Sequence, residues 1–249
     1  MLTEERHAII LDTVNKNKSV GLNELCQLLY TSESTVRRDL TILDERGLLI
    51  KVRGGAIALA ENYTVVEHNV EEKSKLFIKE KEAIARFAVS LIHDGDFVFI
   101  DAGTTTEKML NYISAKDVTF VTNAFLHAKK LAQRGFKVFI PAGEIKLSTE
   151  AIVGAECLLS LQNYNFTKCF MGVNGISVSG GFSTPDINEA SVKTAVINNG
   201  QNVYVLADHS KFDKVTAVKF AALNRAKIIT DKLEDKKYLT ETSVKEVLS

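Results

Sequence analysis

The chain has 249 residues, enough for one large domain or for a small and a medium one. Its 31 Lys and Arg residues balance 31 Asp and Glu residues, so any nucleic-acid binding must come from locally placed charge. Three widely separated cysteines offer neither a disulfide framework nor a Cys-x-x-Cys metal site. No apolar run reaches the roughly 18 residues of a membrane span, and no signal peptide is evident, so we expect a cytoplasmic protein.

The first thirty residues predict two short amphipathic helices. Apolar residues recur at helical spacing over 4–16 and again over 22–29, with a polar break between them. A third helix is expected a few residues later. Two closely spaced helices, of which the second is basic on one face, have the spacing of a helix-turn-helix.

The third helix is the expected recognition helix. Ser32 is a good N-cap for it, and Gly47 is a good stop. The polar side chains that face away from its apolar stripe can meet phosphates and guanine in a major groove. An Arg-Arg pair on such a helix can also be ordinary solvated surface. The side chains that we assign to DNA binding here are Ser34, Thr35, Arg37, Arg38 and Thr41.

A strand with two cations is expected after this helix. Residues 48–53 alternate, and Lys51 and Arg53 lie on one side before two glycines end the strand. This pattern predicts the wing of a winged helix, which contacts the DNA backbone or the minor groove. Residues 1–57 hold eight basic and eight acidic side chains, so the positive patch is local and strong non-specific binding is not expected.

The rest of the chain predicts a second domain. Residues 58–75 are charged and poorly periodic, and we assign them to a linker between domains at 1–57 and 76–249. Beyond residue 97, apolar runs alternate with helical patterns, which predicts an α/β domain with a mainly parallel sheet covered on both faces. Ligands of such sheets bind beyond the carboxyl ends of the strands. The polar residues at those ends are Asp101, Thr104, Thr105, Thr106, Thr122, Asn123, Asn174, Gly175, Asp208, Ser210 and Lys211.

The turn from Gly103 to Thr106 is a candidate anion site. A strand that feeds a Gly-Thr-rich turn opening a helix brings backbone N–H groups and hydroxyls together. The turn lacks the Lys of a P-loop and the spacing of a dinucleotide-binding loop, so a nucleotide is not indicated. A tight turn with threonine caps is the alternative. The five histidines show no ligand spacing, so we expect no metal and no cofactor.

The stretch STVRRDLTILDERGLLIKVRGGA, residues 34–56, closely resembles the DNA-binding segment of the DeoR family of bacterial repressors. One departure is Tyr30, where that family usually has Gly; a positive φ there would cost about 1 kcal/mol. The second domain is similar to the sensor domain of the same family, which is similar in fold to ribose-5-phosphate isomerase. The matching pieces are DAGTTT (101–106), VTN (121–123), MGVNGI (171–176), EASVK (189–193) and ADHSKF (207–212).

The resemblance implies a winged helix-turn-helix followed by an α/β sensor of phosphorylated sugars. It implies that the loop at 103–106 holds the phosphate, with Lys211 as a cationic contact. The residues then available to sugar hydroxyls are Asp101, Asn123, Asn174 and Asp208. We also assign Gly175 and Glu189 to effector binding. A hexose phosphate is expected, with fructose 1-phosphate as the first candidate.

The predicted function is a DNA-binding regulator, most simply a repressor of a sugar-utilisation operon. A dimer would bind two half-sites of double-stranded operator DNA, so we expect a homo-oligomer, a dimer or a tetramer. The alternative is a sugar-phosphate isomerase-like enzyme with an appended DNA-binding module, in which Asp186, Glu189 or Asp208 could act as the base. We favour the regulator, because a sensor benefits from binding its signal without consuming it. An activator would use the same machinery.

Overall fold

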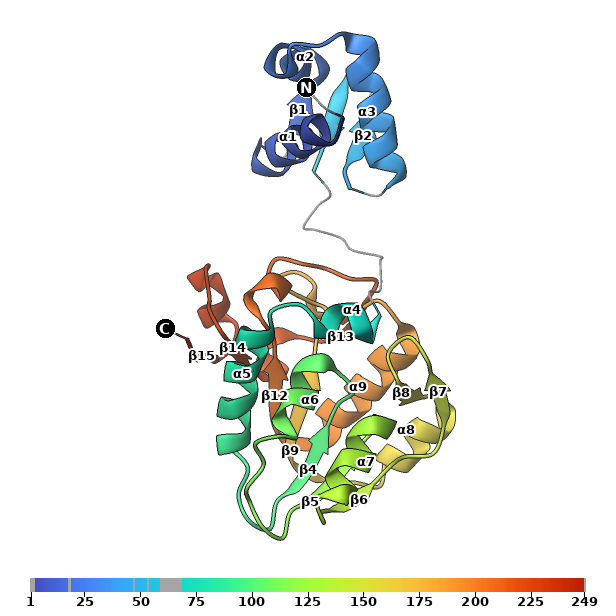
Figure 1. The fold of residues 1–249 in the computed structure, drawn as a ribbon, viewed down its shortest axis with the longest axis vertical. Helices are drawn as coiled ribbons and strands as arrows, with labels where there is room; N and C mark the ends of the chain where they lie inside the picture. Colours follow the sequence, from blue (N-terminus) through green and yellow to red (C-terminus); the bar gives the residue numbers. More distant parts are fainter. Residues whose placement is uncertain (1–2, 18, 47, 53, 59–68, 249) are drawn as a thin grey trace. The chain divides into compact units, whose positions relative to one another are not determined.

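The computed structural model describes residues 3–17, 19–46, 48–52, 54–58 and 69–248. The chain divides into two compact units, residues 1–64 and residues 65–249 (Figure 1). Gly47 and Arg53, which the sequence analysis assigns to the helix end and the wing, lie outside the described residues. None of the helices in the described ranges has both the length and the apolar composition that a membrane crossing requires.

The N-terminal unit is a winged helix-turn-helix, as the sequence predicts. A three-stranded antiparallel sheet completes it, with β3 pairing with β1 on one side and β2 on the other. The strands β1 and β3 are not apparent in the sequence, because three residues are too few to show a period of two. In chain order the elements are α1 (Thr3–Asn17), β1 (Ser19–Gly21), α2 (Leu22–Leu29), α3 (Glu33–Glu45), β2 (Ile50–Val52) and β3 (Gly55–Ile57).

The entry to α3 has the expected cap and the expected strain. The backbone N–H of Thr35 donates to Ser32 Oγ at 3.4 Å, so Ser32 is the N-cap. Tyr30 ends α2 with φ at 48°, the left-handed conformation that favours glycine. Its side chain is 95% exposed, so no side-chain burial offsets that strain. The apolar stripe of α3 is buried in the core of the unit, as predicted: Val36, Leu40 and Leu43.

A buried carboxylate joins the recognition helix to α1. Asp39 is 2% exposed and accepts hydrogen bonds from Arg6, from Nε at 2.5 Å and from Nη2 at 2.9 Å. Its Oδ1 lies 3.1 Å from Nε2 of His7. Burial acts to raise the pKa of Asp39, but the hydrogen bonds from Arg6 and His7 outweigh it and hold that pKa below its usual range. The ion pair therefore fixes the position of α3 on α1.

The C-terminal unit is built on a seven-stranded parallel sheet with the order β15-β14-β12-β9-β4-β5-β6. From β4 the chain adds strands outward to β6, and from β9 it adds them in the opposite direction to β15. The direction therefore reverses between β4 and β9. The strands are β4 (Phe97–Ile100), β5 (Thr119–Thr122), β6 (Lys137–Phe139), β9 (Phe166–Gly172), β12 (Gly200–Leu206), β14 (Lys227–Thr230) and β15 (Val244–Glu246).

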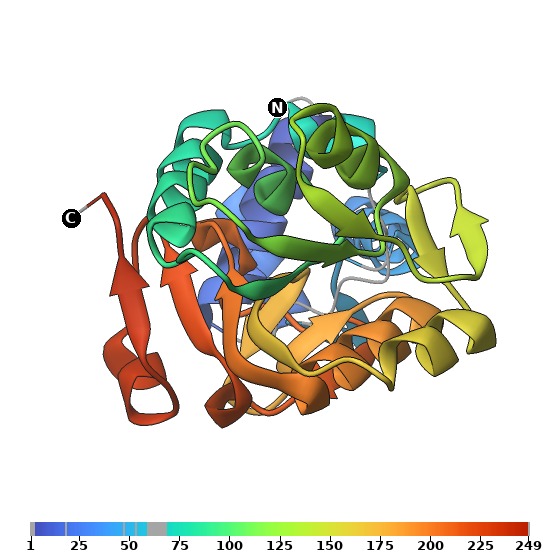
Figure 2. The same cartoon turned by 90° about the horizontal axis from the view of Figure 1, so that it is seen from below.

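Helices cover both faces of this sheet (Figure 2). One face packs on α5 (Ile78–Ser90), α6 (Thr104–Met109) and α7 (Phe125–Gln133). The other packs on α8 (Ala155–Leu161) and α9 (Ile187–Asn199). Strand residues alternate between the two cores, since Val98 and Ile100 join the first and Phe99 joins the second. This is the α/β architecture that the sequence predicts.

Smaller elements complete the C-terminal unit. One lies in the stretch that the sequence analysis assigns to the linker, the helix α4 (Val70–Ser74), whose first N–H donates to the carbonyl of Ser148 at 3.2 Å. The others are the hairpin β7 (Glu144–Lys146) and β8 (Ala151–Val153), the antiparallel strands β10 (Gly175–Ser177), β11 (Gly181–Thr184) and β13 (Val218–Ala221), and the 3-10 turns η1 (His209–Lys211), η2 (Leu223–Arg225) and η3 (Lys236–Thr240).

Loss of the Asp39 carboxylate should destabilise the N-terminal unit. The variant Asp39→Ala removes a buried carboxylate that is bonded to Arg6 and His7, so we expect a loss of about 1–3 kcal/mol in the free energy of unfolding. Since the pKa of Asp39 is lowered by folding, this contribution is present at neutral pH and is lost as the pH falls through that pKa. Urea denaturation measures the loss of stability and its dependence on pH. The control is Asp12→Ala, which removes an exposed carboxylate of α1. Equal stabilities of the two variants would contradict the role of Asp39.

Candidate DNA-binding surface and ligand pocket

The wing strand and the recognition helix share one surface. Nζ of Lys51 on β2 donates to Oγ1 of Thr41 on α3 at 2.6 Å. The backbone N–H of Lys51 donates to Oδ1 of Asp44 at 3.1 Å. The structure therefore brings together Thr41 and Lys51, two of the residues that the sequence analysis assigns to DNA binding.

The two arginines of α3 differ in their contacts. Arg37 is paired with Glu33 at 2.5 Å, and both side chains are more than half exposed. An exposed pair of this kind contributes only a few tenths of a kcal/mol, so Arg37 can exchange it for a phosphate at little cost. Arg38 is exposed and forms no ion pair with any residue in the described ranges. At the start of the helix, Ser34 and Thr35 place their hydroxyl oxygens 3.0 Å from Oγ of Ser32.

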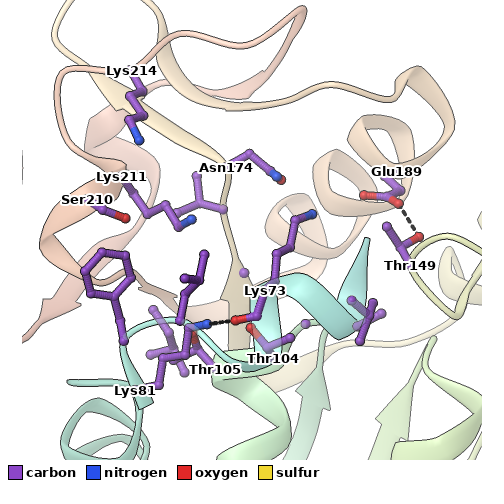
Figure 3. Close-up of a pocket in the computed structure, with 18 of the residues that line it drawn as sticks. Lys73, Lys81, Thr104, Thr105, Thr149, Asn174, Glu189, Ser210, Lys211 and Lys214 are labelled. Atoms are coloured by element: carbon purple, nitrogen blue, oxygen red, sulfur yellow. Dashed lines mark hydrogen bonds between the residues drawn. The ribbon is translucent and has the colours of Figure 1, made fainter. Parts of the chain in front are cut away.

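A cavity of about 260 Å³ lies at the carboxyl ends of the parallel strands (Figure 3). Its walls come from the segments that follow β4, β9 and β12, together with α4 and the start of α5. It therefore lies where the strand order reverses, which is the place where open parallel sheets bind ligands. We call this cavity the pocket.

Lysines dominate the pocket, and Glu189 is the one carboxylate among its described lining residues. Ser210 and Lys81 lie on one side in Figure 3, and Glu189 with Thr149 lies on the other. The cationic side chains that line the pocket are Lys73, Lys81, Lys193, Lys211 and Lys214, and the hydroxyl groups belong to Thr104, Thr105, Thr149 and Ser210. Ammonium and hydroxyl donors in this number suit an anion with several acceptor oxygens.

Burial lowers the pKa of two of these lysines, Lys81 and Lys214. Lys81 is 3% exposed, and its Nζ donates to the backbone carbonyl of Lys73. Burial lowers the pKa of Lys81 to about 8; Asp208 opposes this, and Lys211 adds to it. Burial likewise lowers the pKa of Lys214. An anion in the pocket would favour the charged form of both lysines.

The structure divides the predicted ligand residues into two groups. The residues that line the pocket are Gly103, Thr104, Thr105, Asn174, Glu189 and Lys211. The residues that are not part of its lining are Asp101, Thr106, Asn123, Gly175 and Asp208.

Asp101 supports the pocket and is not part of its wall. It is 1% exposed, forms an ion pair with Lys193, and accepts the backbone N–H of Gly172 at 2.8 Å. Burial raises the pKa of Asp101, while Lys193 and the Gly172 amide act in the opposite direction. Thr106 is also buried, and its hydroxyl donates to the Asp101 carbonyl at 2.7 Å. Lys193 and the Gly172 amide both bond Oδ2 of Asp101, and its expected contact with sugar hydroxyls stays a prediction.

The other three residues are likewise supporting ones. Asn123 is 2% exposed and accepts the Ala102 N–H at 3.0 Å through Oδ1. Asp208 is 1% exposed, and its Oδ1 accepts from the backbone and hydroxyl of Ser210. At Gly175 a Cβ would lie 2.6 Å from a backbone oxygen, so this position needs a glycine to let two segments meet. Oδ2 of Asp208 is buried and has no hydrogen-bond partner among the described residues. The expected contacts of Asn123 and Asp208 with a ligand stay predictions.

Two buried lysines of the pocket, Lys81 and Lys193, are absent from the predicted ligand residues, although their positions in the sequence indicate them. Lys81 precedes Ile84 and Ala88 at helical spacing, and Lys193 precedes Val196 in the same way. Both lysines therefore belong to the buried stripes of α5 and α9. A lysine within an apolar stripe must have a buried partner or a ligand.

The fold and these two surfaces define a DNA-binding regulator with a small-molecule sensor domain. The model of the DeoR-like helix-turn-helix domain matches residues 6–62, and that of the DeoR C-terminal sensor domain matches residues 77–232. The chain belongs to the DeoR family of transcriptional regulators.

Relatives with similar full-length sequences are named as regulators, not as enzymes. The HTH-type transcriptional regulator FruR of Bacillus subtilis is 40% identical over 94% of this chain and 93% of its own. The lactose phosphotransferase system repressor of Staphylococcus aureus is 34% identical over 94% of each chain. Among solved structures, ribose 5-phosphate isomerase A of Methanocaldococcus jannaschii is similar at a TM-score of 0.39, with 16% identity over 53% of each chain.

Arg38, the exposed arginine of α3 that forms no ion pair among the described residues, should contribute to DNA affinity. We expect Arg38→Ala to weaken binding about tenfold and to reduce the slope of affinity against salt by about one counterion. Fluorescence anisotropy with a duplex selected by the wild-type protein from a random pool measures both. The control is Lys16→Ala, which removes an exposed cation of α1. An unchanged affinity and salt slope for Arg38→Ala would remove this residue from the interface.

Anion binding in the pocket should depend on pH through Lys81. An anion favours the charged form of Lys81. The affinity of the pocket for an anion is therefore highest below the pKa of about 8 and falls as the pH rises through that value. Sulfate keeps its charge over this range, so its affinity should fall about tenfold from pH 7 to 9.5. Calorimetry measures this, and Lys81→Arg should remove most of the dependence. A wild-type affinity that is constant over this range would contradict the assignment.

Proposed function

We propose that the C-terminal unit binds a phosphorylated sugar, and that this ligand controls the affinity of the N-terminal unit for double-stranded operator DNA. The protein would act as a repressor of a sugar-utilisation operon. The observation that supports this most directly is the pocket with its five lysines, placed where the strand order of the sheet reverses. The similarity to the lactose phosphotransferase system repressor supports the link to a sugar.

The phosphate is assigned to the side of the pocket formed by Lys81, Lys211 and Thr105. A dianionic phosphate offers only acceptors. The two lysines offer only donors, and the hydroxyl of Thr105 offers one donor. The helix α6 begins at Thr104, and the first N–H groups of a helix have no partner within it. They add donors next to the hydroxyls of Thr104 and Thr105.

The sugar is assigned to the opposite side of the pocket. Glu189 is 9% exposed, and its Oε1 accepts from Oγ1 of Thr149 at 2.6 Å and from Nζ of Lys146 at 3.1 Å. A carboxylate repels phosphate but accepts hydrogen bonds from hydroxyls, so Glu189 orients the ligand. Asn174 can bond hydroxyls as donor or acceptor. A hexose phosphate fits this division, with fructose 1-phosphate as the first candidate.

The helix α4 is the proposed route from the pocket to DNA binding. Val70 and Lys73 of α4 line the pocket. In the chain, α4 is the first described element after the N-terminal unit, so a ligand that contacts it acts on the segment that leads to the recognition helix. In a homo-oligomer, a dimer or a tetramer, a change in this segment would alter the spacing of two recognition helices. The effector must then bind one arrangement more tightly than the other.

The test combines ligand binding with DNA binding. We expect one of fructose 1-phosphate, fructose 6-phosphate and glucose 6-phosphate to bind, free fructose not to bind, and the bound ligand to lower operator affinity by about 5–150-fold. Lys211→Ala should weaken the ligand at least tenfold, because it removes a cation from the phosphate side, and should keep DNA affinity. Calorimetry and fluorescence anisotropy measure these quantities.

The control for this test is Lys236→Ala, which removes an exposed lysine outside the pocket. It should change neither affinity. Failure of every sugar phosphate to bind would refute the proposed effector class. Loss of DNA binding in Lys211→Ala would show that this residue supports folding and not ligand recognition.

A further inference from the structure

A second cavity, of about 20 Å³, adjoins the pocket. Val70, Ala102, Gly103 and Thr149 belong to the walls of both cavities. About 10–15 Å³ of such space accommodates one water molecule, so this second cavity has room for one hydroxyl group. We call it the side cavity.

One residue that lines the side cavity has a buried polar atom without a hydrogen-bond partner among the described residues. His127 of α7 lines it and is 5% exposed. Its Nδ1 is buried and has no hydrogen-bond partner among the described residues. Burial lowers the pKa of His127 to about 4, with Glu107 acting in the opposite direction. At neutral pH the imidazole is therefore uncharged, and Nδ1 is a donor or an acceptor according to the tautomer.

The other polar groups of the side cavity exclude a phosphate. Glu107 and Glu150 line it, whereas none of its described lining residues is a lysine or an arginine. Glu107 is paired with Lys130 outside the lining. A neutral group that both donates and accepts hydrogen bonds is compatible with a lining that has an uncharged imidazole and two carboxylates. A sugar hydroxyl is such a group.

The two cavities are arranged so that one ligand can occupy both. Thr149, which belongs to both walls, lies with Glu189 across the pocket from Lys81 and Ser210 (Figure 3). A sugar whose phosphate is held at Lys81 and Lys211 therefore extends toward the side cavity.

We infer that the side cavity binds a hydroxyl group at the end of the sugar remote from its phosphate, and that His127 determines specificity for sugars that carry this hydroxyl. The inference rests on the proposed function, because it takes the phosphate to lie among the lysines. The hydroxyl would give Nδ1 the partner that it lacks in the protein. A ligand without this hydroxyl would leave that atom buried and unpaired, and would bind more weakly.

The test compares a long ligand with a short one in the same variants. Calorimetry measures the affinities of the wild-type protein, His127→Leu and His127→Asn for fructose 1-phosphate, fructose 6-phosphate, glucose 6-phosphate and inorganic phosphate. We expect His127→Leu to lower the affinity for the best-bound hexose phosphate at least tenfold and that for inorganic phosphate less than twofold. His127→Asn should recover part of the loss. The exposed His93→Leu is the control and should change neither affinity.

A spectroscopic measurement on the wild-type protein separates recognition from a structural role. The imidazole ¹⁵N signals of His127 should shift when the bound hexose phosphate is added and should stay in place with inorganic phosphate. Equal losses for both ligands in His127→Leu, or unshifted His127 signals with bound hexose phosphate, would overturn the inference. A wild-type protein that binds no hexose phosphate refutes the proposed function itself. Equal affinities of the wild-type protein and both His127 variants for hexose phosphate would refute only the role of His127.

Discussion

The pocket depends on the buried ion pair between Asp101 and Lys193. Asp101 follows β4 directly, and its carboxylate accepts the Gly172 N–H at the end of β9 at 2.8 Å. Lys193 projects from α9, and besides its bond to Asp101 it donates to the Gly172 carbonyl at 3.2 Å. The pair thus joins two strand ends and a helix at the point where the sheet reverses its strand order. Removing either partner would leave the other charge buried and unpaired, which is strongly destabilising.

The same principle positions the recognition helix in the N-terminal unit. Asp39 of α3 is buried and paired with Arg6 of α1. In both units a buried carboxylate is paired with a cation and fixes an element that carries side chains assigned to function. Lys81 and Lys214 of the pocket differ from these structural pairs, because their pKa values are lowered and an anion would raise them again. An anionic ligand can therefore supply the free energy that shifts an equilibrium between two arrangements.

The sequence predicts the architecture well and the pocket in part. The helix-turn-helix, the parallel sheet and the edge of the sheet where polar residues gather are all evident, because each rests on a repeated pattern. The direction of a side chain at that edge is not evident: Thr105 lines the pocket, whereas Thr106 beside it is buried and bonds the Asp101 carbonyl. The strands β1 and β3, of three residues each, are too short to predict. Tyr30 stands where the DeoR family usually has glycine, and it has the positive φ that this glycine predicts.

The central claim is that ligand in the pocket acts on DNA binding through α4. Hydrogen exchange of the backbone amides of residues 69–77 tests it most directly, in full-length protein with and without a saturating hexose phosphate. We expect slower exchange across α4 over the same ligand concentrations that lower operator affinity. Unchanged exchange in α4 at concentrations that release the operator would contradict the account.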